Sequence, residues 1–472
     1  MIKIVDFKIK GITSNSKEIK KGFMFVAIKG SRQDGNRFIQ EAIRRGASVI
    51  VVEKNLPLKE IPGKVNYLIV NDCRKFFAQA THQFYGEPSD KIKVVGITGT
   101  NGKTTISYLI EAIAEKSGFE CGVIGTINYR FKGSVLAAGN TTPGAGLLQS
   151  LLKKMRGQKI KYCAMEVSSH ALDQERVLGI NFRQAIFTNL TQDHLDYHEN
   201  LENYFLAKAK LFRSLAPVSS AIINNDDAYG RRIKQLTKAK VLTYGIKNKS
   251  DVMAKRINFG LYSTEFSLIA PGLNTRIKTS LSGGYNVYNL LAAVSWAISE
   301  KIPIQKIKLA IEEFQNVPGR LEAVDSAKGF GIFVDYAHTP DALLNVIGAL
   351  RPLVGGKIIV VFGCGGERDK LKRPLMGKVV TELADYAIIT SDNPRSENPE
   401  EIIKDIRKGI QKKNFCSIPE RRQAIKKGLS LAEEGDCLLI AGKGHEDYQV
   451  LKNRTLKFSD RKVVCECLKL MK

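Results

Sequence analysis

Short apolar runs alternate with amphipathic segments along the whole chain of 472 residues. Buried strands that alternate with amphipathic helices are typical of α/β domains with mostly parallel sheets. In the first part of the chain we expect helices near 37–46 and 76–85 and strands at 47–52 and 67–70. The cluster Gly-Glu-Pro-Ser at 86–89 is rich in turn formers and predicts a linker to a second domain.

The middle of the chain shows the same alternation around a glycine-rich loop. A predicted strand at Val94–Thr98 is followed by the loop and then by an amphipathic helix at Thr104–Lys116. Three further apolar segments bounded by turns are expected to be strands, at 162–167, 184–188 and 220–224. Strands separated by helices favour a mostly parallel sheet, and ligands of such sheets bind where the strands end.

After Pro318-Gly319-Arg320 the alternation begins again and predicts a third α/β unit of doubly wound character. Its expected elements are strands at 332–336, 357–362, 386–390 and 437–441, and helices at 340–350, 374–383, 399–412, 421–432 and after Asp460. The chain is thus expected to be α/β throughout, with domains at residues 1–88, 89–317 and 318–472.

Composition agrees with a globular protein of about three domains. Hydrophobic residues make up 43% and charged residues 25%, which excludes a disordered chain. The eight cysteines include no Cys-x-x-Cys pair and several lie in apolar runs, so we expect reduced core thiols in a cytoplasmic protein. The N-terminus lacks the apolar region of a signal peptide, and no apolar stretch is long enough to cross a bilayer, so we expect neither secretion nor membrane insertion.

The net charge of +26, from 73 Lys and Arg against 47 Asp and Glu, is the most unusual feature of the composition. Such an excess points either to anionic partners, such as phosphates or nucleic acid, or to a basic proteome with solvated lysines. Pairs such as Lys20-Lys21 and Lys412-Lys413 are scattered and lack the interleaved aromatic residues of single-strand binders. Charge alone therefore does not identify a partner.

Residues 96–105, Gly-Ile-Thr-Gly-Thr-Asn-Gly-Lys-Thr-Thr, lie at a strand-to-helix junction, where a phosphate-binding loop is expected. Glycines let backbone N–H groups approach phosphate oxygens, Lys103 supplies a cation for the β- and γ-phosphates, and the Thr104 hydroxyl can bind Mg²⁺. The strict form of the motif has glycine where Ile97 stands, and a glycine-rich turn without a ligand is the alternative. The residues expected to hold the nucleotide phosphates are Gly99, Thr100, Asn101, Gly102, Lys103, Thr104 and Thr105.

Polar residues follow two more of the predicted strands. Glu166 ends one strand, and Ser168 and Arg176 come after it. By their chemistry these residues could hold Mg²⁺ and an anionic substrate, or they could only line a polar loop. The next strand leads into Asp-His-Leu-Asp-Tyr-His at 193–198, which could bind a metal or hydrogen-bond to itself as a capped loop. Lys208, on an amphipathic helix downstream, is by itself a solvated surface lysine.

The loop Gly-Thr-Asn-Gly-Lys-Thr-Thr at 99–105 resembles the nucleotide loop of the Mur ligases and of their relative folylpolyglutamate synthase, ATP-dependent enzymes that join an amine to a carboxylate. The order and spacing of further motifs extend the resemblance to the Mur ligases over nearly the full length. It implies a three-domain architecture: a UDP-muramoyl substrate-binding domain, a central P-loop parallel-sheet ATPase domain and a Rossmann-like C-terminal domain. The cofactors that it implies are ATP and Mg²⁺.

The resemblance also implies roles for residues of the nucleotide and metal sites. It makes His194 a magnesium ligand, and the spacing Tyr-x-x-Ala-Lys favours Lys208 over Lys210 as the lysine that CO₂ converts into a carbamate ligand. The implied catalytic residues are Lys103, His194 and Lys208. The implied metal ligands are Thr104, Glu166, His194 and the carbamylated Lys208. The further ATP-contacting residues are Asn286, Arg320 and Asp335.

The same resemblance implies a site for the muramoyl peptide. Asn-Thr-Thr-Pro at 140–143 and the segment around Ser168 resemble the part that holds the peptide, and segments at 13–17 and 25–30 resemble the uridine-binding part. The usual Asp-Ser-Arg triplet of that part appears here as Asn-Ser-Lys at 15–17. The substrate-binding residues implied are Ser16, Ser31, Asn140, Thr141, Thr142, Ser168, Gln174 and Arg176.

Three polar loops of the third domain, at 363–369, 392–395 and 442–446, follow predicted strands and can meet in one crevice. Asp-Asn-Pro-Arg at 392–395 resembles the motif of Mur ligases that add meso-2,6-diaminopimelate, whose second amino-acid centre bears a carboxylate that lysine lacks. Arg395 can pair with that carboxylate and Glu446 can receive the ammonium group. The residues assigned to this substrate are Arg368, Asp392, Asn393, Pro394, Arg395, Gly442 and Glu446.

The resemblance therefore implies a ligase that joins meso-2,6-diaminopimelate to the D-glutamyl γ-carboxylate of UDP-N-acetylmuramoyl-L-alanyl-D-glutamate, through an acyl phosphate, in peptidoglycan precursor synthesis. We expect a monomer that binds these two substrates and ATP, and no nucleic acid. The alternatives are a lysine-adding or D-alanyl-D-alanine-adding Mur ligase, folylpolyglutamate synthase and a nucleic-acid-dependent P-loop ATPase. The motif at 392–395 argues against lysine, and the uridine-type first domain argues against folate.

Overall fold

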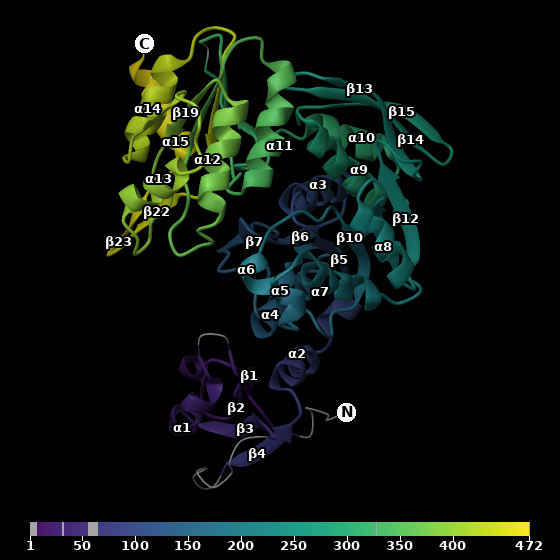
Figure 1. Ribbon diagram of the computed structural model, residues 1–472. Coiled ribbons are helices and arrows are strands. Elements are labelled where there is room, and N and C mark those ends of the chain that lie inside the picture. The colour runs from purple at the N-terminus through teal and green to yellow at the C-terminus, as the bar shows by residue number, and fades with distance from the viewer. Residues whose placement is uncertain (1–6, 31–32, 55–64, 327, 472) are drawn as a thin grey trace.

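The computed structural model describes residues 7–30, 33–54, 65–326 and 328–471, which form three sheet-based units in chain order (Figure 1). The first unit is a parallel sheet in the order β1-β2-β3-β4. Its elements are β1 (Gly11–Thr13), β2 (Phe23–Val26), α1 (Ile39–Arg44), β3 (Ala47–Glu53), β4 (Asn66–Val70) and α2 (Cys73–Phe84). Helix α2 joins the first unit to the second, where it packs against α4 (Ala145–Gly157).

The second unit is an eleven-stranded sheet that is parallel in its middle and antiparallel at both edges. Strand β5 (Lys93–Thr98) is central, between β9 (Tyr162–Glu166) and β10 (Phe182–Phe187). The parallel part also contains β6 (Cys121–Ile124), β11 (Ser220–Asn224) and β12 (Lys240–Gly245). The outer strands are β7 (Asn128–Phe131), β8 (Ser134–Ala137), β13 (Val252–Phe259), β14 (Thr264–Ala270) and β15 (Leu273–Thr279). The loops that follow β5, β6, β9 and β10 therefore meet at the edge of the sheet formed by the carboxyl ends of these parallel strands.

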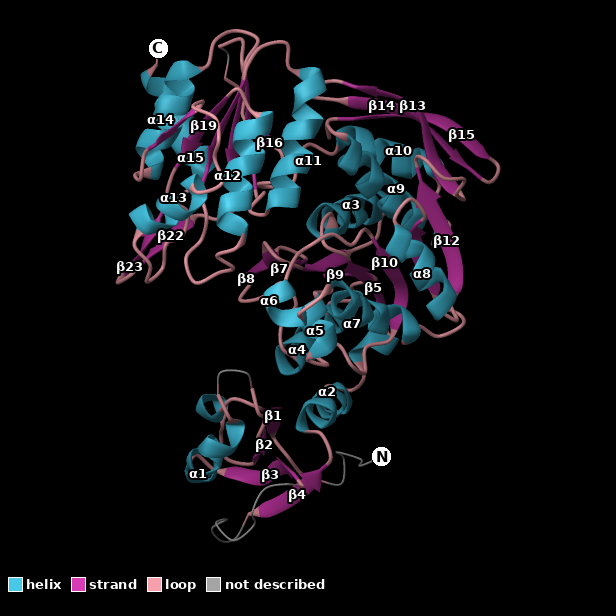
Figure 2. Cartoon of the chain, viewed as in Figure 1, coloured by secondary structure: helices cyan, strands magenta, loops and turns pink. Residues whose placement is uncertain are grey.

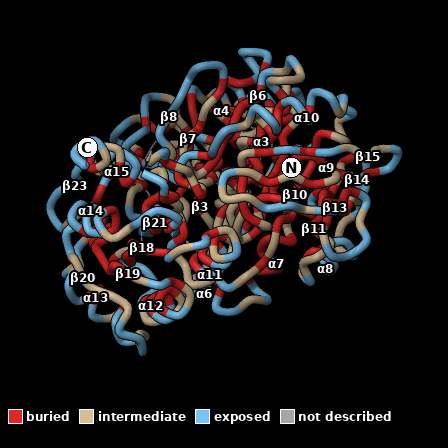
Figure 3. Tube along the Cα trace, turned by 90° about the horizontal axis from the view of Figure 1, so that it is seen from above, coloured by how far each residue is buried: buried red, intermediate tan, exposed pale blue. Residues whose placement is uncertain are grey.

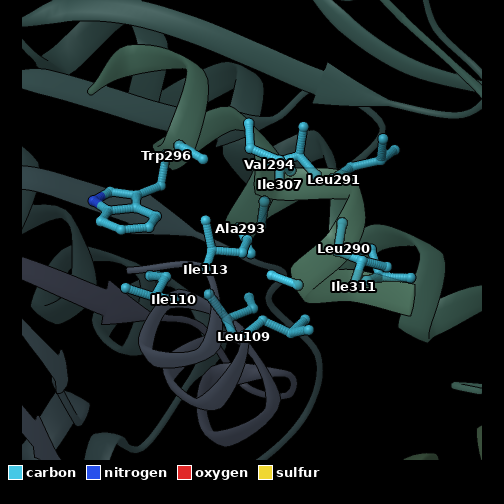
Figure 4. Close-up of a cluster of buried hydrophobic side chains, with 14 of the residues drawn as sticks. Leu109, Ile110, Ile113, Leu290, Leu291, Ala293, Val294, Trp296, Ile307 and Ile311 are labelled. Carbon is cyan, nitrogen blue, oxygen red and sulfur yellow. The ribbon is translucent and has the colours of Figure 1, made fainter. Parts of the chain in front are cut away.

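Helices cover both faces of this central sheet (Figure 2). On one face, α3 (Lys103–Lys116), α9 (Gly284–Ser299) and α10 (Ile304–Glu313) bury their apolar sides together, and Figure 4 shows Leu109 and Ile113 of α3 beside Leu290 and Trp296 of α9. The other face is covered by α4, α5 (Ser169–Asp173), α7 (Leu201–Arg213) and α8 (Ala228–Leu236). Removal of this apolar surface from water stabilises the unit and holds the phosphate loop between β5 and α3 in place.

The third unit is a doubly wound sheet in the order β16-β17-β21-β18-β19-β20. Its strands are β16 (Glu322–Ala323), β17 (Gly331–Asp335), β18 (Ile358–Phe362), β19 (Tyr386–Ile389), β20 (Phe415–Ser417) and β21 (Cys437–Ala441). One face carries α11 (Pro340–Leu350), α12 (Lys372–Leu383) and α13 (Pro399–Arg407), and the other carries α14 (Arg421–Leu431) and α15 (Asp460–Leu470). Figure 3 shows buried chain along β18 and β21. A separate hairpin, β22 (Tyr448–Leu451) and β23 (Arg454–Lys457), follows β21.

Two helices of the third unit, α11 and α13, begin where the sequence places a cap and a proline. Thr339 and Asn398 accept hydrogen bonds from N–H groups in the first turns of α11 and α13, and Pro340 and Pro399 follow them. A cap side chain satisfies an N–H that has no partner within the helix, and proline has no N–H to leave unsatisfied. The predicted starts of these helices at 340 and 399 are confirmed.

Several elements differ from the expectations, and three regions show this most clearly. The helix expected near 37–46 is a 3₁₀ turn (Gly35–Phe38) followed by α1, which ends at Arg44. Helix α13 ends at Arg407 and not near 412, and two residues later Gly409 passes so close to Pro374 that a Cβ would lie 1.9 Å from the proline carbonyl oxygen. Strands β13–β15 were not predicted, since β13 has only three buried residues at its start, β14 and β15 alternate between buried and more exposed positions, and none contains a long apolar run.

The eight cysteines are free thiols, and six of them are buried in the cores. Among the described helices, none has both the length and the apolar character that a membrane crossing would need. The domain boundaries placed after residues 88 and 317 stay predictions.

Candidate active site

The phosphate loop connects the central strand β5 to the start of α3. Gly99 and Gly102 have φ angles of 148° and 89°, and each approaches a neighbouring segment closely. A Cβ on Gly99 would lie 1.8 Å from the hydroxyl of Thr188, and one on Gly102 would lie 2.3 Å from Oδ1 of Asn289. The Lys103 ammonium donates to the carbonyl oxygens of Gly99 and Thr100, at 2.9 and 2.7 Å. The loop therefore needs glycine at both positions and keeps the lysine cation over it.

Glu166, at the end of β9, is held by donors from two directions. The Thr104 hydroxyl donates to Oε2 at 3.0 Å. The N–H and hydroxyl of Thr126 donate to Oε1 and Oε2, each at 2.9 Å. Sequence reasoning missed Thr126, although its position two residues after β6 was a usable signal, because β6 and β9 are neighbouring parallel strands.

Lys208 of α7 is not the solvated lysine that its helix pattern alone suggests. Its side chain is buried, its Nζ donates to the carbonyl oxygen of Gly99 at 2.9 Å and lies 4.3 Å from the centre of the Tyr204 ring. Burial and the nearby cation of Lys103 lower the pKa of Lys208 well below its usual value. Both effects favour the loss of the Lys208 proton next to the phosphate loop.

Three histidines gather beside this lysine. The ring of His170 lies 4.9 Å from that of His194 and 5.5 Å from that of His198, whose Nε2 is 2.9 Å from the Ser169 hydroxyl. His194 has a left-handed backbone, with φ of 55°, and its Nε2 is 3.4 Å from a carboxylate oxygen of Asp193. The turn thus presents the His194 ring at the same sheet edge as Glu166 and Lys208.

The donor chemistry at this edge fits Mg²⁺. Glu166 and Thr104 offer a carboxylate and a hydroxyl, which are the hard oxygen ligands that Mg²⁺ prefers. Within the described residues, no three His, Cys, Asp or Glu side chains form a complete cage. That arrangement suits a cation that is usually bound by one or two carboxylates together with substrate phosphates.

Two further segments bring ATP-site candidates to the loop. Arg320, between the second and third units, donates from Nη2 to the Thr104 hydroxyl at 3.2 Å. The carboxylate of Asp335 accepts from the N–H groups of Leu321 and Ala337, which fixes the turn that carries Arg320. Asn286 accepts from Asn289 at 3.1 Å, and Asn289 is the residue that closes on Gly102.

Sequence reasoning also missed Asp341, at the start of α11. Its Oδ2 accepts from Asn101 Nδ2 at 3.2 Å and from the Thr191 hydroxyl at 3.0 Å. Asn101 belongs to the phosphate loop, so one carboxylate of the third unit binds two segments of the second. Pro340, which follows the helix cap Thr339, predicted the start of α11. Nothing in the local sequence indicated that Asp341 would contact the second unit.

The peptide-site candidates form a connected group at the same edge. Arg176 donates to the Thr142 carbonyl oxygen at 2.9 Å and to Gln174 Oε1 at 2.7 Å, and the Thr142 hydroxyl accepts from the Ser168 N–H at 3.0 Å. The Thr141 hydroxyl lies 3.1 Å from that of Thr126. Asn140 joins them through its carbonyl oxygen, which accepts from the Tyr129 hydroxyl. Ser16 lies in the first unit, where it donates to Glu41, and Ser31 lies outside the described residues.

The loops of the third unit meet as predicted. Asn393 Nδ2 donates to Glu446 Oε2 at 2.7 Å, and Gly442, with φ of 115°, passes so close to Asp392 that a Cβ would lie 2.7 Å from Oδ2. Arg395 donates from Nη1 to the Gly366 carbonyl oxygen at 2.7 Å. A pocket of about 350 Å³ is lined by residues 394–399, which include Pro394 and Arg395, and by Leu451 and Lys452. Arg368 is exposed and donates to the carbonyl oxygen of Glu367.

Three family models match the chain in the order of its three units. Residues 8–85 match "Mur ligase family, catalytic domain" and residues 97–297 match "Mur ligase middle domain". Residues 319–444 match "Mur ligase, glutamate ligase domain". The matches leave only short parts of the chain uncovered.

Several proteins similar over nearly the full length are named UDP-N-acetylmuramoyl-L-alanyl-D-glutamate--2,6-diaminopimelate ligase. The protein of that name from Aquifex aeolicus is 46% identical, over 98% of this chain and 94% of its own length. The one from Clostridium botulinum is 43% identical, over 98% of this chain and 95% of its own. A solved structure of a protein of that name has a TM-score of 0.71 at 32% identity, and the alignment covers 98% of this chain and 95% of the solved one.

Proposed function

Because the chain belongs to the Mur ligase family, we propose that it joins meso-2,6-diaminopimelate to the D-glutamyl γ-carboxylate of UDP-N-acetylmuramoyl-L-alanyl-D-glutamate, with ATP as the energy source, in peptidoglycan precursor synthesis. The observation that carries the choice of amine is the cluster of Asn393, Arg395 and Glu446 in the third unit, in a chain similar to these ligases over 98% of its length. The enzyme is an ATP-dependent ligase that forms an amide bond.

A carboxylate is a poor electrophile, and ATP overcomes this by making it an acyl phosphate. A γ-carboxylate oxygen forms a bond to the γ-phosphorus of ATP, and the bond to the ADP oxygen breaks. The amine of the second substrate then forms a bond to the carbonyl carbon, the tetrahedral intermediate expels inorganic phosphate, and the amine loses a proton. Every step moves negative charge near the phosphate loop, where charge stabilisation is the main catalytic task.

The residues at the sheet edge have different roles in stabilising this charge. Lys103 and the backbone of 99–105 would hold the β- and γ-phosphates, and Arg320 would add a cation from the third unit. Thr104, Glu166, His194 and carbamylated Lys208 would hold Mg²⁺, which supplies charge neutralisation on the transferred phosphoryl group. Asn286 and Asp335 support the loop and the arginine, and Thr126 fixes Glu166.

Carbamylation of Lys208 is supported by its buried, low-pKa amine. The amine in its neutral form, which the lowered pKa favours, forms a bond to the carbon of CO₂ and releases one proton, so that a carbamate with two oxygens replaces the amine. Those oxygens would lie at the phosphate loop, because Nζ is 2.9 Å from the Gly99 carbonyl oxygen. A buried amine would thereby be replaced by a carboxylate-like metal ligand.

The two amide-forming groups would be brought together from different units. Asn140, Thr141, Thr142, Ser168, Gln174 and Arg176 would hold the muramoyl peptide, with Ser16 and Ser31 on its uridine end. In the third unit Arg395 would bind the distal carboxylate of diaminopimelate, and Glu446 would take the distal ammonium. Arg368, Asp392, Asn393, Pro394 and Gly442 complete this side of the site.

Product analysis tests the function directly. The enzyme is incubated with UDP-N-acetylmuramoyl-L-alanyl-D-glutamate, ATP and either meso-2,6-diaminopimelate or L-lysine, and the products are weighed by mass spectrometry. We expect the diaminopimelate adduct, ADP and phosphate, with little lysine adduct. Equal use of both amines would contradict the proposed substrate, and nucleotide hydrolysis stimulated by RNA or DNA and indifferent to the muramoyl peptide would contradict the ligase reaction.

A further inference from the structure

Lys443 is a buried cation behind the proposed diaminopimelate site, and the sequence motifs assigned it no role. Its side chain has 0% exposure. Its Nζ donates to Glu446 Oε2 at 2.9 Å and to Asn393 Oδ1 at 3.1 Å, and lies 5.6 Å from the centre of the Tyr448 ring. A buried ammonium group is costly unless it is paired, so its position next to two substrate-site residues needs an explanation.

The contacts of Lys443 decide which atoms of the site stay available to a ligand. Asn393 Oδ1 already accepts from Lys443 and from the Val450 N–H, and its Nδ2 donates to Glu446. Glu446 Oε2 therefore has two donors. Within the described part of the chain no donor is assigned to Oε1, which leaves that oxygen as the acceptor for a substrate ammonium.

Lys443 also contributes to the net charge of the site to which the ligand would bind. The buried Arg421 is neutralised by two hydrogen bonds to Asp460, at 2.8 and 2.7 Å. Burial and nearby cations lower the pKa of His445 to about 3, so that it is neutral. Glu397, which lines the adjoining pocket, is paired with Arg373 at 3.0 Å, and Arg368, Asp447 and Lys452 are exposed to water, which screens their charges. The charged groups that remain around Asn393 are two cations, Lys443 and Arg395, and two anions, Asp392 and Glu446.

A site with balanced charge distinguishes the two amines. The distal end of diaminopimelate carries an ammonium and a carboxylate and leaves the balance unchanged, whereas the distal end of lysine carries an ammonium alone and adds an uncompensated cation. Discrimination by an unfavourable charge in the wrong complex is as effective as an added contact in the right one.

We propose that Lys443 is a specificity-determining residue: its buried charge offsets that of Glu446, so that the site accepts a zwitterionic amino-acid end and rejects a lone ammonium. The inference rests on the proposed function and goes beyond it. The positive contact to the extra carboxylate comes from Arg395, and the penalty against lysine comes from Lys443.

The test compares the ratio of kcat/KM for diaminopimelate to that for L-lysine in four proteins: the wild type, Lys443→Met, Glu446→Gln and Lys457→Met. Lys443→Met keeps the length of the side chain and removes its charge. Lys457 is an exposed residue of β23, opposite Tyr448, and serves as the matched control. Fluorescence of the single tryptophan and the thermal unfolding midpoint verify that each variant is folded.

We expect Lys443→Met to lower the ratio at least about tenfold, through a higher KM for diaminopimelate and a lower one for lysine, with KM for ATP unchanged. Glu446→Gln removes the ammonium acceptor and leaves a net positive site, so the ratio should rise. Lys457→Met should match the wild type.

A folded Lys443→Met protein whose ratio stays within about threefold of the wild type would overturn the proposal. If Lys443→Met does not fold, Glu446→Gln decides, because a fall of the ratio in that variant is incompatible with the charge balance. A wild-type enzyme that uses lysine as well as diaminopimelate would instead contradict the proposed function, and the two failures are therefore distinguishable.

Discussion

At the scale of single residues, the side chains with the strongest constraints are buried charges that bind several elements at once. Glu300, which follows α9, is an example away from the active site. Its carboxylate accepts from Lys93 of β5, Tyr162 of β9 and Gln184 of β10, and its side chain is 3% exposed. Burial raises the pKa of Glu300, but the donors from Lys93 and Gln184 outweigh it, so its pKa is lowered overall.

Glu300 should therefore stabilise the central unit in a pH-dependent way. A depressed pKa in the folded state contributes stability above the ordinary value of 4.5, and that contribution is lost as the pH falls through the lower folded-state pKa. We expect Glu300→Gln to cost about 1–3 kcal/mol at neutral pH and progressively less below that value. Urea unfolding followed by the fluorescence of Trp296, which packs 5.2 Å from Tyr162, measures the effect.

The matched control is Glu313→Gln, which breaks an exposed pair with Lys116 and should change stability by less than about 0.5 kcal/mol. A cost for Glu300→Gln that grows on acidification would contradict the assignment.

Lys208 gives a second prediction at this scale. Lys208→Ala removes the amine proposed to react with CO₂ and should reduce ligase activity on the order of 100-fold, because the proposed metal ligand is lost. The wild type should lose activity in CO₂-depleted buffer and regain it with bicarbonate, and native mass spectrometry should show one added CO₂ unit. Lys210→Ala is the control, because Lys210 is an exposed partner of Asp173. Near-normal activity of Lys208→Ala at every CO₂ level would exclude the carbamate.

At the scale of secondary-structure elements, the phosphate loop depends on a close approach between the start of α3 and the side of α9. Gly102 combines φ of 89° with a Cβ position 2.3 Å from Asn289, whereas Gly118, just after the same helix, has φ of 82° and open space around it. Both glycines thus have a positive φ, but Gly102 lies against the Asn289 side chain whereas Gly118 has open space beside it.

Alanine substitutions at Gly102 and Gly118 therefore distinguish a steric clash that displaces the loop from strain in the backbone alone. Both Gly102→Ala and Gly118→Ala should cost about 1–2 kcal/mol of stability, since alanine disfavours positive φ. Gly102→Ala should in addition reduce ATP-dependent activity on the order of 100-fold, because the loop must move off the phosphates. Steady-state kinetics and equilibrium binding of ADP measure the difference, and equal activity of both variants would show that the Asn289 contact is unimportant.

At the scale of the whole molecule, two residues of the third unit form three hydrogen bonds to the second unit at and beside the phosphate loop: Arg320 to Thr104, and Asp341 to Asn101 and Thr191. The reactants are expected to come from different units, so the orientation of these units controls the reaction. Asp341 is the better probe of that orientation, because it lies on the third unit and is not assigned to a substrate.

Asp341→Ala should loosen the third unit and raise KM for ATP roughly 3- to 10-fold, as expected for the loss of two hydrogen bonds. Small-angle scattering should show a larger radius of gyration for the variant. Asn345→Ala is the control, since Asn345 lies one turn later on α11 and also donates to Asp341 Oδ2. An unchanged KM and radius in Asp341→Ala would mean that the contact does not hold the units together.

The sequence by itself determined the elements and the motifs. Apolar periodicity, caps such as Thr339 and prolines such as Pro340 are local signals, and the phosphate loop is contiguous, so its chemistry could be predicted from ten neighbouring residues. Predictions were weakest where no long apolar run exists, as in β13–β15, and at helix ends such as that of α13, which ends at Arg407, two residues before the close approach of Gly409 to Pro374.

Only the tertiary structure decided which side chains support the site. Thr126 reaches Glu166 across 40 residues, Lys443 reaches Asn393 across 50, and Asp341 reaches Asn101 across 240. Each of these contacts depends on the order of strands in a sheet or on the orientation of two units. Local hydrophobic periodicity determines neither the strand order nor the orientation. The burial that makes Lys208 a reactive amine has the same origin, because it requires α7, the phosphate loop and Tyr204 to close around one side chain.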